Sequence, residues 1–222
     1  MRLTVVAGTG GVGSQILAQA LAAGHDVTVV VRNPVTLMGQ PIRVVVDDLA
    51  APDAASLQSA VRGADVVLSG LGARSGAEAG VASRGTRAIA QAMQTIDVRR
   101  IVVVSAASVG TVPSPRRPNP PRHNPGDGFF MRHLAAPLAK AAFRRHYEDL
   151  ALMEDVLEES DLDWTVVRPP RLIDRRLTGV YRTAYEQNVR AGMFISRADV
   201  AHLMLDVIGR PETIHHVIGI AY

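Results

Sequence analysis

The chain has 222 residues, of which 47% are hydrophobic and 20% are charged, and its net charge is +3. This size and composition are typical of a soluble enzyme with one core, and no apolar run is long enough to span a membrane. The chain contains no cysteine, which excludes disulfides and thiolate metal sites. The arginines are scattered rather than gathered, which argues against nucleic-acid binding. Residues 1–7 lack a secretory signal pattern, so we expect a cytoplasmic protein. We expect it to be a monomer or a small homo-oligomer.

Six short, valine-rich runs have the pattern of parallel strands that are buried on both faces. They cover residues 3–7, 27–31, 42–46, 66–68, 101–104 and 164–167. Segments between them place apolar residues at helical spacing, as Ile16, Leu17 and Ala20 do. This alternation predicts an α/β fold of the Rossmann type, a doubly wound parallel sheet with helices on both faces, in one domain over 1–222.

A glycine-rich segment follows the first predicted strand. Residues 8–13 read "GTGGVG" and match the dinucleotide fingerprint G-x-G-x-x-G, between a strand and a helix. In this fingerprint Gly8 permits the tight turn, Gly10 lets the backbone approach a pyrophosphate, and Gly13 lets helix pack on strand. The helix N-terminus then binds the phosphates. The alternative is a glycine turn without a ligand.

The end of the second strand indicates which cofactor is bound. An NAD-preferring site has an acidic residue there, but this chain has Arg32, which suits a 2′-phosphate and favours NADP over NAD. Alternatively, Arg32 stacks on adenine or faces solvent. After the third strand, Asp48 and Leu49 are placed to meet the adenine edge, unless the acidic residues cap a helix ahead of Pro52.

Residues 109–128 contain six of the thirteen prolines and follow the fifth strand at its carboxyl end. Such a segment cannot continue a helix or a central strand, and ligands bind at this edge of an open α/β sheet. We predict a lid loop over 109–128, followed by a helix over about 129–160. Segments near 129–135, with Phe129 and Phe130, and near 171–195 are the predicted substrate side.

Motifs that run in order through nearly the whole chain carry a family resemblance. They include "AGTGGVG", "VVVRNP", "RRIVVVSAASVG", "SDLDWTVVRPPRL" and "ISRADVAHLML". The chain resembles the atypical short-chain dehydrogenase/reductase family, in particular the branch with biliverdin-IXβ reductase/flavin reductase and bacterial NAD(P)H-binding proteins. The cofactor contacts predicted from the fingerprint and this resemblance are Gly8, Thr9, Gly10, Gly11, Val12, Gly13, Arg32, Asp48, Leu49, Leu71, Gly72, Ala73, Arg74, Ser105 and Pro169.

The chain departs from the family at the catalytic positions. Family dehydrogenases use a Tyr-x-x-x-Lys pair, but His146 and Leu150 stand at those positions here. The flavin-reductase-like branch has a histidine after its Pro-Pro, where this chain has Arg171. The resemblance therefore implies hydride transfer between stacked rings, to a flavin, a quinone or a similar conjugated small molecule that takes its proton from water.

Three residues are candidates for catalytic roles. Ser105, or Ser108 near it, would hydrogen-bond the acceptor, unless the Ser105 hydroxyl satisfies backbone at the strand end. Arg171 would hold an anionic group. His146 would act as a general acid, unless it is a helix-surface histidine.

A histidine pair and a helix start have structural interpretations, and two other functions are alternatives to a reductase. His215 and His216 are neighbours on a strand and point to opposite faces, so we expect no metal site. Ser196 and Asp199 have the spacing of a capping box.

Loss of both the Tyr-x-x-x-Lys pair and the post-proline histidine would also fit a non-catalytic NADP(H)-binding redox sensor. A sugar-nucleotide epimerase is a further alternative, which the missing Tyr-x-x-x-Lys pair disfavours.

Overall fold

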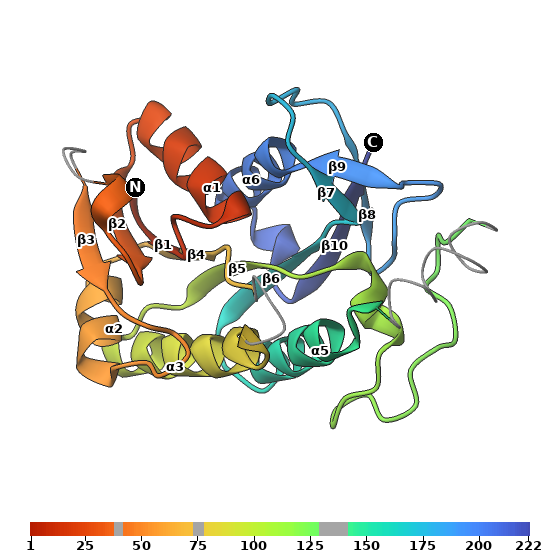
Figure 1. Cartoon of the computed structure of the whole chain (residues 1–222), viewed down its shortest axis with the longest axis horizontal. Coiled ribbons are helices and arrows are strands. Elements are labelled where there is room, and N and C mark those ends of the chain that lie inside the picture. Colours follow the sequence, from red (N-terminus) through yellow and green to blue (C-terminus); the bar gives the residue numbers. More distant parts are fainter. Residues whose placement is uncertain (38–41, 73–77, 129–141) are drawn as a thin grey trace.

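A mostly parallel sheet forms the centre of the molecule (Figure 1). The computed structural model describes residues 1–37, 42–72, 78–128 and 142–222. Within these ranges the eight-stranded sheet has the order β3-β2-β1-β4-β5-β6-β10-β8. Its strands are β1 (Arg2–Val6), β2 (Asp26–Val31), β3 (Arg43–Val46), β4 (Val66–Ser69), β5 (Arg100–Val104), β6 (Asp163–Arg168), β8 (Arg182–Tyr185) and β10 (His216–Ala221). Only the edge strand β8 runs antiparallel to its neighbour in this sheet.

Helices cover both faces of the sheet, as a doubly wound fold requires (Figure 1). On one face, α1 (Gly11–Ala22) packs against α6 (Arg197–Asp206). On the other face, α3 (Val81–Ile96) packs between α2 (Ala54–Val61) and α5 (Arg144–Glu158). No helix in the described ranges is both long enough and apolar enough to cross a membrane.

Alternating side chains of the strands build two hydrophobic cores, one on each face. Val5 and Val29 belong to the core beneath α1 and α6. Val6 and Val30, one residue further along each strand, belong to the core beneath α2, α3 and α5. Because successive strand residues point to opposite faces, a continuous valine run fills both cores. This confirms the predicted Rossmann-type doubly wound sheet.

The second half of the chain adds elements that the sequence pattern did not predict. A short strand β7 (Arg171–Ile173) pairs in parallel with β9 (Phe194–Ser196), in a separate two-stranded sheet. Strands β8 and β10 extend the main sheet beyond β6. The helix predicted over about 129–160 corresponds to α5, which begins only at Arg144, after its N-cap Phe143, and ends at Glu158. Residues 129–141, which include Phe129 and Phe130, lie outside the described ranges.

The structure confirms the serine cap of the predicted capping box at the start of α6, but not the reciprocal bond, because the Ser196 N–H donates to the Tyr222 hydroxyl at 3.3 Å. The Ser196 hydroxyl oxygen accepts the Asp199 N–H at 2.9 Å. The Asp199 carboxylate in turn accepts N–H groups from Thr178 at 2.9 Å and Gly179 at 2.8 Å, and the hydroxyl of Tyr222. Burial would raise the pKa of Asp199, but these hydrogen bonds hold it below the ordinary value. Asp199 therefore fixes the segment between β7 and β8 to the helix.

Candidate cofactor and substrate site

A tight backbone turn joins β1 to α1. Ala7 adopts the left-handed conformation with φ 57°, and its carbonyl accepts the Gly10 N–H at 2.8 Å. At Gly8, a Cβ would lie 2.2 Å from Cγ2 of Val29. The left-handed residue of the turn is thus Ala7 rather than Gly8, and Gly8 lacks a side chain because Val29 fills that space.

Two further glycines let α1 approach the sheet closely. A Cβ on Gly13 would lie 2.1 Å from the Ala7 carbonyl oxygen, and one on Gly70 would lie 2.7 Å from the Gly13 nitrogen. Both contacts involve backbone atoms that cannot move aside, so neither position has room for a side chain. Gly70, just after β4, was not predicted, because its contact depends on the pairing of β1 with β4.

The N-terminus of α1 is open to an anionic ligand. Its first turn contains no acidic residue, and its N-cap Gly10 has no side chain to satisfy the free N–H groups. Free N–H groups and the helix dipole together attract a phosphate. The residues present therefore fit the pyrophosphate of a dinucleotide.

A cavity of about 260 Å³ opens beside this turn, at the carboxyl ends of β1 to β4. It brings together six of the predicted cofactor residues: Thr9, Arg32, Asp48, Leu49, Leu71 and Gly72. Val81, from the start of α3, completes the apolar part of its wall. We call it the adenosine cavity, because its position and lining suit an adenine ring and its ribose. The predicted contacts Ala73 and Arg74 lie outside the described residues.

An ion pair stands at the wall of the adenosine cavity. The Arg32 guanidinium lies 3.1 Å from the Glu78 carboxylate, and 54% of the Arg32 side chain is exposed. The sequence analysis did not predict Glu78, because Glu78 lies between β4 and α3, whereas Arg32 follows β2. Asp47, also in the wall, is buried, and this burial raises the pKa of its carboxyl group. The helix cap ahead of α2 is neither Asp47 nor Asp48 but Asp53, which accepts the Ser56 N–H at 2.8 Å.

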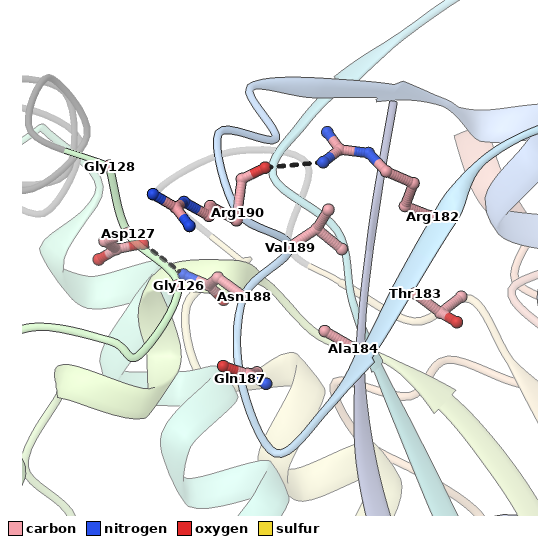
Figure 2. Close-up of a pocket in the computed structure, with 10 residues that line it drawn as sticks. All are labelled: Gly126, Asp127, Gly128, Arg182, Thr183, Ala184, Gln187, Asn188, Val189 and Arg190. Carbon is pink, nitrogen blue, oxygen red and sulfur yellow. Dashed lines mark hydrogen bonds between the residues drawn. The ribbon is translucent and has the colours of Figure 1, made fainter.

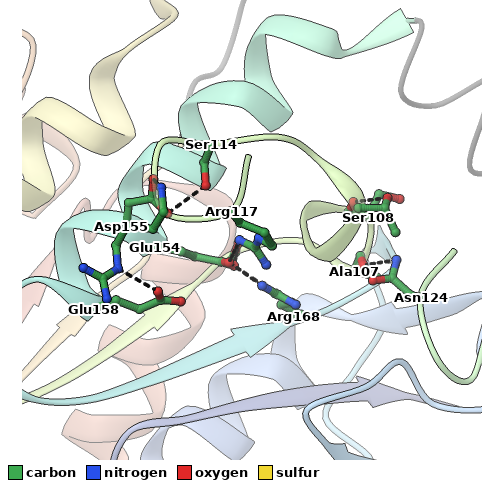
Figure 3. A network of polar contacts seen from close by, with 12 residues as sticks. Ala107, Ser108, Ser114, Arg117, Asn124, Glu154, Asp155, Glu158 and Arg168 are labelled. Carbon is green, nitrogen blue, oxygen red and sulfur yellow. Dashed lines mark hydrogen bonds and ion pairs between the residues drawn. The ribbon is translucent and has the colours of Figure 1, made fainter. Parts of the chain in front are cut away.

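Ser105 follows β5 and takes part in a buried polar network around Glu154. Figure 3 shows Glu154 with Arg117 and Arg168. The Ser105 hydroxyl donates to Oε1 of Glu154 at 2.7 Å. Glu154, in α5, also accepts hydrogen bonds from Arg168, whose Nε lies at 2.9 Å, and from Arg117 at 3.3 Å. Burial alone would raise the pKa of Glu154, but the adjacent Arg168 charge and these hydrogen bonds hold it below the ordinary value. The Ser105 hydroxyl thus bonds to a buried carboxylate, a partner that sequence reasoning did not include.

His146 lies at the start of α5 and faces the end of β4. Its Cε1 is 3.9 Å from the position a Cβ would take on Gly72. Its Nδ1 is buried and has no hydrogen-bond partner among the described residues. Burial lowers the pKa of His146, against a smaller opposing effect of Asp149. The imidazole is therefore mostly neutral near pH 7, and it offers hydrogen bonding more readily than acid catalysis.

The next residue, Tyr147, extends the same polar edge. Its phenol hydrogen-bonds to Ser108, while burial raises its pKa. At the end of β6, the Pro169 carbonyl accepts the Ala107 N–H at 2.9 Å and so joins this strand end to the segment that follows β5. Arg171 begins β7 two residues later and is exposed.

A second cavity, of about 760 Å³, lies between residues 126–128 and 182–190 (Figure 2). The two segments are joined directly, since Asn188 donates its N–H to the Pro125 carbonyl at 3.0 Å and its side-chain amide to Asp127 at 2.7 Å. Gly126 has φ +89°, and a Cβ there would lie 2.0 Å from the Asn188 carbonyl oxygen. This close contact fixes the two segments as one wall, which we call the 126–190 wall.

The proline-rich segment is attached to the rest of the fold at both ends. Asp155, next to Glu154 in α5, accepts the Ser114 hydroxyl at 2.8 Å and the Arg116 N–H at 3.2 Å. Further along, the Asn124 side chain donates to the Ala107 carbonyl at 3.0 Å. Figure 3 shows both attachments. The second one connects the 126–190 wall to the strand ends that hold Ser105 and Pro169.

Solved structures of other proteins share this fold. ChuY, an anaerobillin reductase from Escherichia coli O157:H7, is 24% identical with a TM-score of 0.77, covering 100% of this chain and 97% of its own. SP1627 from Streptococcus pneumoniae TIGR4, a proposed NADH-flavin reductase, is 24% identical with a TM-score of 0.74. The match covers 100% of this chain and 99% of SP1627. A short-chain dehydrogenase/reductase from Veillonella parvula DSM 2008, solved in complex with NADP, is 18% identical with a TM-score of 0.77, covering 100% and 94%.

Family membership follows from the sequence as a whole. A sequence model of the NAD(P)H-binding family matches residues 7–211, a range that includes the turn after β1, the adenosine cavity and most of the second cavity's lining. This match and the shared fold agree with the resemblance found in the motifs. The chain therefore belongs to the family of NAD(P)H-binding proteins.

Proposed function

We propose that the protein is an NADPH-dependent reductase that passes hydride to a flavin, a quinone or a similar conjugated acceptor. The observation that carries this proposal is the arrangement of two cavities along the carboxyl edge of one sheet. The adenosine cavity lies over β1 to β4, and the larger cavity lies beside β8 and β10. Ligands bind at this edge in doubly wound folds.

The residues of the adenosine end support NADPH. The open N-terminus of α1 suits the pyrophosphate, and Arg32 suits the 2′-phosphate. Leu49 and Leu71 provide apolar contacts for adenine. A bound nicotinamide cofactor would supply the hydride. NAD remains the alternative cofactor, because Glu78 offers a carboxylate that can accept ribose hydroxyls.

The larger cavity supports a bulky acceptor. Its volume of about 760 Å³ is within the range of pockets that hold drug-sized organic ligands. Arg182 and Arg190 line it together with one carboxylate, that of Asp127, so its lining carries a net positive charge. Arg171 is exposed at the start of β7. An acceptor with carboxylate or phosphate groups suits such a lining. The reductase names of two solved structures with the same fold, the anaerobillin reductase and the proposed NADH-flavin reductase, agree with this acceptor class.

The polar groups beyond the ends of β4 and β5 suit hydride transfer without a strong acid. His146 is mostly neutral near pH 7, and the pKa of Tyr147 is raised, so neither is a strong proton donor. Ser105 orders the end of β5 through Glu154. We propose that these residues position the acceptor by hydrogen bonds and that its proton comes from water.

The test is NADPH oxidation followed at 340 nm, with NADH in parallel, against flavins, quinones and biliverdin. We expect turnover of at least one acceptor, with NADPH preferred. A matched variant, Asn188→Ala, loosens the 126–190 wall without touching the adenosine cavity, and we expect it to raise KM for the acceptor more than that for NADPH. Tight NADPH binding with no consumption of cofactor by any acceptor would contradict the reductase proposal and favour a redox sensor.

A further inference from the structure

Arg197 lies against the N-terminus of α1, although it is far in sequence from the residues that the fingerprint predicts as cofactor contacts. It is the first residue of α6, and its side chain crosses Gly11, the first residue of α1. A Cβ on Gly11 would lie 2.6 Å from Nε of Arg197 and 2.9 Å from its Cδ. The Arg197 side chain thus occupies the space that any larger residue at position 11 would need.

The position of Arg197 is fixed by contacts of its own helix. The side chain of Gln19 in α1 donates to the Ala198 carbonyl at 2.9 Å, and the Ser196 cap holds the first turn of α6. The first contact connects Ala198, the residue after Arg197, to α1. The second connects Ser196, the residue before Arg197, to Asp199 in the first turn of α6. The backbone that carries the Arg197 side chain is therefore held beside the phosphate-binding turn by the packing of α1 on α6.

The positive charge of Arg197 and of the α1 N-terminus is offset by a single carboxylate at the surface among the described residues. A cation near the N-terminus of a helix is repelled by the helix dipole and by the free N–H groups. The first turn of α1 contains no acidic residue that would offset this repulsion. Among the described residues, the carboxylate in an ion pair with Arg197 is that of Asp174, at 2.7 Å, and the Asp174 side chain is 88% exposed. The guanidinium and the helix N-terminus thus face the same space with the same sign of charge.

We propose that Arg197 binds the pyrophosphate of the nicotinamide cofactor across Gly11, and that it leaves Asp174 to do so. This inference rests on the proposed binding of the cofactor at the glycine-rich turn, and it does not depend on which acceptor is reduced. A guanidinium presents paired N–H donors that match phosphate oxygens, and it forms stronger hydrogen bonds with them than neutral donors form. Asp174 then acts as a competing carboxylate at the surface.

Two substitutions at this ion pair distinguish a phosphate ligand from a structural contact. If the pair only stabilises the fold, Arg197→Ala and Asp174→Asn remove the same contact and change cofactor affinity alike. If Arg197 binds the pyrophosphate, the two substitutions have opposite effects, because one removes the ligand and the other removes its competitor. We expect Arg197→Ala to raise the Kd for NADPH about ten- to a hundredfold, and Asp174→Asn to lower it about two- to fivefold.

The experiment is a fluorescence titration of the full chain with NADPH, with adenosine 2′-monophosphate as a probe that lacks the pyrophosphate. Affinity for this probe should be unchanged in both variants. Arg210→Ala, which removes an exposed arginine paired with Asp206 beyond the same helix, is the matched control and should leave both affinities unchanged. Thermal unfolding of each variant shows that the fold is intact.

Each outcome bears on a different proposal. Equal weakening of NADPH binding by Arg197→Ala and Asp174→Asn, or no change with Arg197→Ala, would overturn the role of Arg197 and leave cofactor binding intact. A wild-type chain that binds neither NADPH nor NADH would overturn the proposed function, and the role of Arg197 with it. Gly11→Ala gives a further check, since its Cβ displaces only the end of a flexible side chain. We expect this variant to fold normally and to bind NADPH more weakly.

Discussion

We expect single residues at the adenosine cavity to set the choice of cofactor. Arg32 could be predicted from the sequence, because its place after the second strand is fixed by the fingerprint. Glu78 could not, because its distance of 3.1 Å from Arg32 arises only when the crossovers after β2 and β4 meet. Gly70 and Arg197 escaped sequence reasoning for the same reason. The fingerprint is local, whereas these contacts join residues from distant parts of the chain.

Arg32→Ala should weaken NADPH binding about tenfold and leave NADH binding nearly unchanged, because a partly exposed arginine loses a charged hydrogen bond to the 2′-phosphate. Glu78→Gln should act in the opposite direction and favour NADPH, since it removes the carboxylate that competes for Arg32. Parallel titrations with NADPH and with NADH measure the ratio of the two dissociation constants. Arg43→Ala, at the neighbouring strand β3, is the control. Equal loss of NADPH and NADH affinity in Arg32→Ala would show that Arg32 contacts the adenine rather than the phosphate.

At the scale of elements, α5 organises the centre of the site. Glu154 and Asp155 are consecutive, yet the first fixes Ser105 and Arg168 while the second fixes the proline-rich segment. The sequence predicted a helix here and placed His146 on it, but the expected surface histidine is partly buried against Gly72. Buried charge on α5 could not be predicted, because its partners come from β6 and from a loop.

Glu154→Gln should destabilise the fold by about 3–5 kcal/mol at neutral pH, because the buried Arg168 loses its counter-charge. The folded-state pKa of Glu154 lies below the unfolded value, so its contribution is fully present above about pH 4.3 and is lost as the pH falls through the folded-state value. Urea unfolding at a series of pH values should therefore show a flatter acid limb in the variant. Asp199 retains some pH dependence, since its pKa is also lowered.

The control for this experiment is Glu159→Gln, at an exposed position at the end of the same helix. It should change the free energy of unfolding by less than about 0.5 kcal/mol. An acid limb of equal slope in the wild type and in Glu154→Gln would show that the pKa of Glu154 is not lowered on folding.

At the scale of the whole molecule, the first half was easier to predict than the second. Strands β1 to β6 are valine-rich, and each predicted run falls on a strand to within about two residues. All but β3 are mostly buried; β3 was also expected to be buried on both faces, but it lies at the edge of the sheet and is partly exposed. Strand β8 is also an edge strand, with mostly exposed residues, and β7 and β9 have three residues each. Strand β10 has an apolar signal in "HVIGIA"; the sequence analysis placed His215 and His216 on a strand but did not count that strand among those of the sheet. Short or exposed strands carry little periodicity, so their pairing depends on the finished fold.

The double attachment of the proline-rich segment has a consequence for how the chain can be divided. Between Arg117, bound to Glu154, and Asn124, bound to Ala107, the backbone of 118–122 is mostly exposed. A cut between Arg122 and His123 separates β1 to β5 from β6 to β10, while the pairing of β5 with β6 and the packing of α3 on α5 stay in place.

We therefore expect a chain with a specific protease site inserted between Arg122 and His123 to remain one particle after cleavage. The two fragments should co-elute on size exclusion and bind NADPH with the affinity of the uncut chain. Separation of the fragments under native conditions would contradict this expectation. If the fragments stay together, the two halves of this sheet form a natural pair for fragment complementation, in which cofactor binding reports that two separately expressed pieces have met.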